Sequence, residues 1–301
     1  MERDDFIIYV FCVASDFYHE LCAEKPLRQR GFPPALSDAE VITMEICGEY
    51  FGHDQDEDIF DYFYDHYRHF FPALHERTVF VRQAANLLHI KQRIQSRIVS
   101  ASGQADDDCQ IIDTLPLPVC TFTRARRDRC FKPDADYGYC AAKQMHYYGF
   151  KLGLRISRSG MIAHFPLLPA RPHDSQLLDD LIAGYEGAVI GDKAFIDGWR
   201  QQQLQRKRNI ILLTGSRKNM SQQLPNHFRR VCRRLRKKVE TVGSHLTERF
   251  QIARTRARDL WHYEHRIVRK VLAHTVCVYI NLQLGRPPLD LDSLVSSKVA
   301  H

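Results

Sequence analysis

The sequence predicts an all-helical region over residues 1–100, followed by an α/β domain with a mixed β-sheet over residues 109–285. Two observations predict this division. Apolar residues before the polar linker at 101–108 recur at helical spacing, whereas short apolar runs typical of strands alternate with helical segments after it. Alternating strands and helices are typical of an α/β architecture. Residues 286–301 are expected to form a C-terminal tail.

The N-terminal region is predicted to consist of helices throughout. Residues 6–23 have helical apolar spacing. The stretch "SDAE" is a capping box that opens a second helix, with Ser37 as the cap and Glu40 reaching back to it. Acids at the start of the segment 54–71 complement a helix N-terminus. Residues 77–98, with five basic residues and no acid, form the last predicted helix.

The second region has the element order of a known α/β architecture. Strand, hairpin, helix, strand, helix, strand and helix follow one another, which is the order of the ribonuclease-H-like fold with its mixed five-stranded sheet. In that fold the first and fourth strands are adjacent and parallel. The predicted elements are strands at 109–120, 147–157, 160–170, 188–195 and 209–215, and helices at 173–186, 197–208, from 226 onward and at 262–284.

Charge is distributed unevenly along the 301 residues, whose net charge is +7. Residues 1–112 contain 10 Lys/Arg and 20 Asp/Glu, and the remainder contains 33 and 16. The window 226–258 holds eleven Lys/Arg and two Glu. A solvated helix face is one interpretation, but so many cations repel one another unless a polyanion is near. The window therefore predicts nucleic acid as a partner.

Composition predicts a soluble, cytoplasmic protein. Hydrophobic residues are 44% and charged residues 26%. We expect no membrane segment, because no apolar run approaches the roughly 20 residues that a spanning helix needs. The first residues carry acids where a signal peptide is basic. Nine cysteines without a zinc-ligand spacing predict reduced thiols.

Two strand carboxylates predict a metal site. Asp113 follows Ile–Ile in the first strand, and Asp192 ends the apolar run of the fourth. Adjacent carboxylates repel unless cations intervene, and Mg²⁺ prefers such oxygen ligands. Phosphodiester chemistry often uses two such ions, and the basic helix offers Glu240 as the third carboxylate. Glu248 lies eight residues further, about 80° round the helix and about 12 Å along it. Alternatively, the aspartates begin or cap turns, Asp192 pairs with Lys193, and Glu240 is a surface residue.

Longer segments resemble bacterial insertion-sequence transposases of the DDE type. The resemblance is carried by "SDAEVITMEICGEYFG", "HFFPAL", "TVFVRQAANL", "IIDTLPLPVC", "YYGFKLGLRIS", "VIGDKAF", "VETVGSHLTERFQIARTRARDLWH" and "RKVLAHT". It implies that Asp113, Asp192 and Glu240 bind two Mg²⁺ or Mn²⁺ ions as the catalytic triad. Relatives often carry Tyr-x2-Arg-x3-Glu-x6-Lys around the glutamate. Arg236 matches the arginine, whereas Arg233 and Thr247 replace the tyrosine and the lysine, with Arg249 nearby.

The resemblance implies cleavage at insertion-sequence ends and transfer of the 3′-hydroxyl into target DNA. The expected partners are the terminal inverted repeats and target DNA, with a homodimer in the synaptic complex near the bacterial nucleoid. A nuclease of the same fold and an inactive, transposase-derived DNA-binding protein are the alternatives. The candidate DNA contacts are Arg82, Lys91 and Arg93 in the helical region and Lys193, Arg236, Lys237, Lys238 and Arg249 in the second region.

Overall fold

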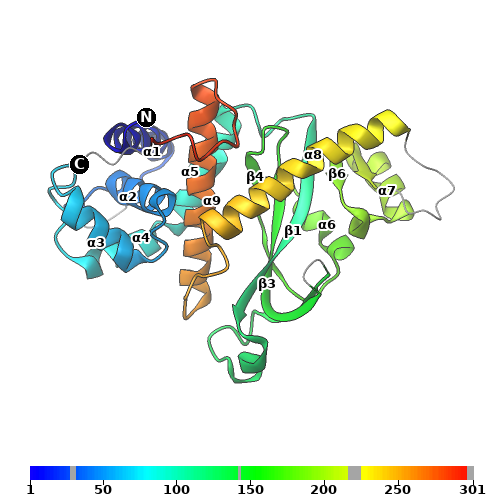
Figure 1. The fold of residues 1–301 in the computed structure, drawn as a ribbon, viewed down its shortest axis with the longest axis horizontal. Helices are drawn as coiled ribbons and strands as arrows, with labels where there is room; N and C mark the ends of the chain where they lie inside the picture. Colours follow the sequence, from blue (N-terminus) through cyan, green and yellow to red (C-terminus); the bar gives the residue numbers. More distant parts are fainter. Residues whose placement is uncertain (28–31, 142–143, 216–224, 297–301) are drawn as a thin grey trace. The chain divides into compact units, whose positions relative to one another are not determined.

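The chain forms two compact units in its computed structural model (Figure 1). The helical unit combines residues 1–101 with 245–301, and the sheet unit comprises residues 102–244. The predicted α/β domain extends to residue 285, so its last part belongs instead to the helical unit. The residues that the structure describes are 1–27, 32–141, 144–215 and 225–296.

The helical unit contains the predicted N-terminal helices. The capping box is present, because the Ser37 side chain accepts the Glu40 N–H while the Glu40 carboxylate accepts the Ser37 N–H. The predicted helix 77–98 is two helices, because the chain leaves helical conformation at Leu87 (φ −84°, ψ 7°). The elements are α1 (Arg3–Glu24), α2 (Asp38–Phe51), α3 (Asp56–His66), α4 (Arg77–Asn86), α5 (Leu88–Ala101), a π-helical turn (His245–Arg249) and α9 (Leu260–Gln283).

The last helix, α9, returns to the N-terminal helices and packs against α2 and α5. Its burial is nearly complete and includes charged side chains, since Arg269 and Lys270 have no exposed surface. Both cations bind Glu49 of α2, at 2.6 Å from the Arg269 Nε and 2.7 Å from the Lys270 Nζ. Buried cations need such paired partners. The pairing therefore explains why α9 belongs to the helical unit although it follows the sheet in sequence.

The first helix, α1, has the length and hydropathy of a membrane-spanning segment. This finding differs from the sequence expectation that no segment would reach that apolarity. Phe6, Val10, Phe17 and Leu21 are nevertheless buried in the helical unit, where α1 packs against α2 and α5. Ile8 and Phe11 of the same helix are exposed, and 39% of its most apolar window is buried.

The sheet unit has the predicted ribonuclease-H-like topology. Its main strand order is β2-β3-β1-β6-β7, and β4 and β5 both pair with β3. β1 is antiparallel to β3 and parallel to β6, which is parallel to β7. The strands are β1 (Cys109–Cys120), β2 (Asp136–Cys140), β3 (Met145–Ile156), β4 (Ile162–His164), β5 (Leu167–Pro169), β6 (Gly187–Gly191) and β7 (Ile210–Thr214). Strand β2 was not predicted, because its sequence "DYGYC" has no apolar run.

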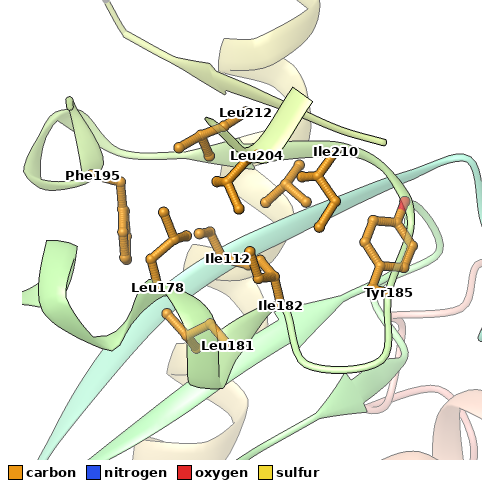
Figure 2. Packing of buried hydrophobic residues seen from close by; sticks show 10 residues of the cluster. Ile112, Leu178, Leu181, Ile182, Tyr185, Phe195, Leu204, Ile210 and Leu212 are labelled. Carbon is orange, nitrogen blue, oxygen red and sulfur yellow. The ribbon is translucent and has the colours of Figure 1, made fainter. Parts of the chain in front are cut away.

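Helices and apolar side chains cover one face of this sheet (Figure 2). The predicted helix at 173–186 is shorter and begins as a 3₁₀ turn, Asp174–Leu177, before α6 (Leu178–Leu181). It is followed later by α7 (Gly198–Arg208). Their side chains meet those of the strands in a buried cluster of Ile112, Leu178, Leu181, Ile182, Tyr185, Val189, Phe195, Leu204, Ile210 and Leu212.

The long basic helix α8 (Asn226–Ser244) lies against β1 and β6 (Figure 1). The sequence predicts an apolar stripe along its whole length. The structure buries Val239 and Val242 only in the second half, whereas Phe228 is 46% and Val231 40% exposed. The predicted periodicity is therefore present, but the stripe is covered only where the helix lies over the sheet.

Candidate active site

The strand register places Asp113 and Asp192 side by side. β1 and β6 run parallel, and Ile111 is the register partner of Ile190. Each aspartate lies two residues beyond that pair, at the carboxyl end of the β1–β6 pairing, with Asp192 still in extended conformation (φ −82°, ψ −175°). The predicted pairing of the first and fourth strands, from which this juxtaposition was inferred, is confirmed.

Both aspartates face the side of the sheet that carries α8. Side chains alternate between the two faces of a strand. Ile112 belongs to the buried cluster on the α6–α7 face, so its neighbour Asp113 points to the opposite face (Figure 2). A Cβ atom at Gly191 would lie 3.0 Å from the ring of Phe195 in that same cluster. Gly191 therefore faces the cluster, and Asp192 after it faces α8.

One oxygen of each carboxylate is held by a nearby backbone N–H. Asp113 Oδ1 accepts the N–H of Thr114 at 2.9 Å, and Asp192 Oδ1 accepts that of Ala194 at 2.6 Å. Asp192 thus caps the 3₁₀ turn that follows it, as one alternative interpretation of the sequence had it. Within the described part of the chain, no hydrogen bond involves the Oδ2 atom of either residue. The hydrogen bond to Oδ1 therefore orients each half-buried side chain, and the Oδ2 atom of each stays available as a ligand.

The electrostatics of the pair favour a cation. Burial, with a smaller contribution from the charge of Asp192, raises the pKa of the Asp113 carboxyl from 3.8 to about 6. The Thr114 N–H and the Arg236 guanidinium act in the opposite direction. The donor set is carboxylate oxygen, which suits hard divalent ions. The two aspartates therefore fit a Mg²⁺ or Mn²⁺ site.

The third predicted ligand, Glu240, lies exposed on α8 beside the buried Val239. Among the described residues, no hydrogen bond or ion pair joins its carboxylate to another group. Arg236, four residues earlier on α8, acts electrostatically on Asp113. Glu248 lies in the π-helical turn, which belongs to the helical unit. The structure thus brings Asp113 and Asp192 together, and the role of Glu240 stays a prediction.

A further carboxylate near the pair, Asp174, was not predicted as part of the site. Its charge contributes to the raised pKa of Asp113. Asp174 itself accepts from Lys151 Nζ at 2.9 Å, and Lys151 also donates to the carbonyl of Pro172. The sequence indicated Asp174 only as a residue starting a helix. Only the fold shows that it lies close enough to influence Asp113.

The predicted DNA-contacting cations of the sheet unit differ in exposure. Lys193 and Lys237 are exposed, whereas Arg236 and Lys238 are half-buried. Lys238 donates to the backbone carbonyl of Arg158. Of these four cations, Lys193 and Lys237 are therefore the more accessible.

The predicted cations of the helical unit are less uniform. Arg82 is exposed, and Arg93 pairs with Glu24 at 3.1 Å on the surface. Arg249 lies 4.3 Å above the ring of Tyr50 and pairs with Asp292. Of these three cations, Arg82 is the one for which the described part of the structure shows no partner.

Lys91 requires a correction, because it has no exposed surface. Its ammonium lies 2.7 Å and 2.9 Å from the two oxygens of Glu45 and 3.0 Å from the carbonyl of Ala84. A buried and fully paired ammonium cannot reach a phosphate. The prediction that Lys91 contacts DNA is therefore wrong. The residue spacing around Lys91 could not show that it is buried and paired, because its partner Glu45 lies 46 positions away in the sequence.

The same buried region holds a second group of potential metal ligands, Glu45, Asp56 and His265. Glu45 accepts from His265 at 2.8 Å as well as from Lys91, and Asp56 pairs with arginines of α9. Protein cations thus already neutralise these carboxylates. The group is an ion-pair network that joins α9 to the N-terminal helices, not a metal centre.

Comparison with known proteins agrees with the strand-end site. A family model described as a transposase DDE domain matches residues 103–260, which contain Asp113, Asp192 and Glu240. No curated protein and no solved structure matches the chain. The matched segment spans more than half of the chain and contains the entire sheet. The chain therefore belongs to the family of transposases with a DDE domain.

Proposed function

We propose that this protein is a bacterial insertion-sequence transposase that cuts DNA at the element ends and joins the 3′-hydroxyl to target DNA. The observation that supports this most strongly is the pair Asp113 and Asp192. Their carboxylates lie side by side on one face, at the carboxyl end of the β1–β6 pairing and on the side of the basic helix α8. This arrangement lies within the segment that matches the DDE domain.

Asp113, Asp192 and Glu240 would hold two Mg²⁺ or Mn²⁺ ions. Such ions, when bound, supply activation of the attacking oxygen and stabilisation of the leaving oxygen. The protein contributes orientation, because the N–H groups of Thr114 and Ala194 hold the aspartates in place before any substrate arrives.

Glu240 is the third carboxylate that the helix geometry favours. Residues four apart lie on the same side of a helix, one turn from each other. Since Arg236 influences Asp113, Glu240 lies on the corresponding side of α8 one turn further along. The buried Val239 next to it fixes that part of the helix to the sheet unit.

Double-stranded DNA would be bound by the cations around this site, of which Lys193 and Lys237 are exposed. Lys193 stands next to Asp192, and α8 carries Arg236, Lys237 and Lys238 over the sheet. Phosphate contacts of this kind position DNA without reading its sequence. Recognition of the terminal inverted repeats would involve Arg82 of the helical unit. We further propose a homodimer that holds two element ends, in the bacterial cytoplasm at the nucleoid.

A strand-transfer assay distinguishes this function from a nuclease of the same fold. Labelled element-end DNA is offered either uncut or with a free 3′-hydroxyl, together with target plasmid and Mg²⁺. The proposal expects covalent joining of the precut end to the plasmid. Hydrolysis without joining would favour the nuclease. Binding without either reaction would favour an inactive DNA-binding protein. Asp113→Asn serves as the control, because it should retain DNA binding and lose both reactions.

A further inference from the structure

An exposed aromatic surface lies in the sheet unit, away from the carboxylates. Phe122 is 49%, Tyr137 45% and Tyr139 52% exposed, and His146 is exposed beside them. Large apolar side chains gathered on a surface often mark an interaction site. We call these four residues the aromatic platform.

Strand pairing places the platform on one face of the β2–β3 ladder. Tyr139 is the register partner of His146, with ring centroids 4.8 Å apart. Phe122, from the 3₁₀ helix Phe122–Arg127, lies edge-on to Tyr137 at 5.8 Å. Between the tyrosines, Gly138 faces inward, since a Cβ there would lie 2.8 Å from Tyr147. The alternation of the strand therefore directs both tyrosine rings outward.

Unpaired cations border the platform. Five basic residues occupy the segment 124–132, and within the described part of the chain no ion pair neutralises any of them. Residues 122–140 also contain three acids, Asp128, Asp134 and Asp136, so the five cations exceed the acids by two. Asp128 accepts the Phe131 N–H, and Asp136 accepts the Tyr137 N–H. The exposed cations are Arg124, Arg126, Arg127, Arg129 and Lys132. The surface thus combines flat rings with a surplus of positive charge.

We propose that the aromatic platform binds unpaired DNA bases by stacking, while the neighbouring arginines hold the backbone phosphates. Stacking on exposed rings combined with a basic track is the physical basis of single-strand binding. A paired base inside a duplex does not present its face to such rings. A protein that docked here through an apolar surface would leave the five cations without counter-charges. Charge complementarity therefore favours a polyanion as the partner.

The platform is separate from the carboxylate pair. Cys120, whose register partner Tyr148 also pairs with Tyr137, lies seven positions beyond Asp113 along β1. At about 3.3 Å per residue this corresponds to roughly 23 Å. Binding here requires neither metal nor cleavage. The proposal therefore goes beyond strand transfer and can fail or succeed independently of it.

The test measures binding of a fluorescent oligothymidylate of roughly twelve nucleotides to the full-length protein in EDTA. Tyr137→Leu and Tyr139→Leu remove the ring but keep apolar surface, and each should weaken binding about tenfold. Tyr139→Phe keeps the ring and should bind like wild type. Trp199→Leu, at a 70% exposed aromatic on α7, is the matched control and should have no effect. Binding of a duplex of equal length should be unchanged in the leucine variants.

Cation removal gives a second, distinguishable result. Arg124→Ala, Arg126→Ala and Arg127→Ala combined should lower affinity and reduce the salt dependence of binding. Leucine variants that bind oligothymidylate normally, or lose single-strand and duplex binding equally, would overturn the proposal. So would a change of oligomeric state in light scattering with intact single-strand binding, which would indicate a second copy as the occupant.

A measurement on the wild-type protein protects the test against variants that fail to fold. An oligonucleotide with photoreactive iodouracil is cross-linked to the protein, and the modified peptide is identified by mass spectrometry. Attachment at Phe122, Tyr137 or Tyr139 supports stacking on the platform. Attachment only at other positions contradicts it.

Discussion

Lys91→Met should destabilise the helical unit strongly without a direct effect on DNA contacts. The Lys91 ammonium makes three hydrogen bonds of 2.7–3.0 Å in a site without exposure. Its removal leaves the buried Glu45 carboxylate with His265 at 2.8 Å and Arg269 at 3.9 Å. Breaking one partner of a buried pair costs about 3–5 kcal/mol, because the remaining charge is poorly compensated.

This free energy corresponds to a large thermal shift. A unit of roughly 160 residues loses about 2–4 °C in unfolding midpoint for each kcal/mol. The Lys91→Met midpoint should therefore fall by about 6–20 °C in differential scanning calorimetry. Arg93→Ala, two residues along the same helix, is the matched control. Its exposed pair with Glu24 contributes at most about 1 kcal/mol, so the midpoint should fall by less than about 4 °C.

A double variant tests whether the loss comes from the uncompensated charge. Glu45→Gln keeps an acceptor for His265 but removes the negative charge. Combined with Lys91→Met, it should destabilise the unit less than the two single changes added together, with a coupling above about 1 kcal/mol. A Lys91→Met protein that melts like wild type but binds element ends weakly would refute the buried network and restore the DNA assignment.

Three further predictions concern the site and its DNA. Glu240→Gln should abolish cleavage of labelled element ends while leaving DNA binding intact in gel shifts. Glu248→Gln should keep most of the cleavage activity. The reverse pattern would exchange the roles of the two glutamates. Mg²⁺ should raise the unfolding midpoint of the wild-type protein but not that of Asp113→Asn. An equal rise in both proteins would place the ion elsewhere. Ca²⁺ should support assembly of the protein–DNA complex without efficient cutting. Arg82→Ala combined with Arg93→Ala should weaken end binding and flatten its dependence on salt, and an unchanged salt series would exclude that surface.

The sequence was sufficient to predict the carboxylate pair for a physical reason. Asp113 and Asp192 each follow a short apolar run, and such runs become neighbouring parallel strands only in a few sheet topologies. Strand order and side-chain alternation then determine which groups meet. Side-chain alternation is a local property of each strand, and the strand order follows from the order of strands and helices along the chain.

The buried network could not be predicted, because its partners are remote in sequence. Lys91 lies on an amphipathic helix among other cations, where a charged residue normally indicates the solvent face. Its partner Glu45 is on α2, and Arg269 and Lys270 come from α9, more than 170 residues away. Likewise, the periodicity of α8 indicates which side is apolar but not how far the sheet beneath it extends. Phe228 is exposed for that reason.

The charges around the aspartate pair explain why a divalent cation suits this place. Asp174 forms an ion pair with Lys151 at 2.9 Å, so it adds no net negative charge near the aspartate pair. The charge of Arg236 acts on Asp113, and its Nε atom is buried without a hydrogen-bond partner among the described residues. One guanidinium cannot neutralise two carboxylates, and the approach of Glu240 would leave a surplus of two negative charges. Oxygen-rich surroundings with that surplus favour a doubly charged hard ion over another protein cation. The same surplus would repel DNA phosphate, so productive binding of a DNA end and binding of the ions are expected to reinforce each other.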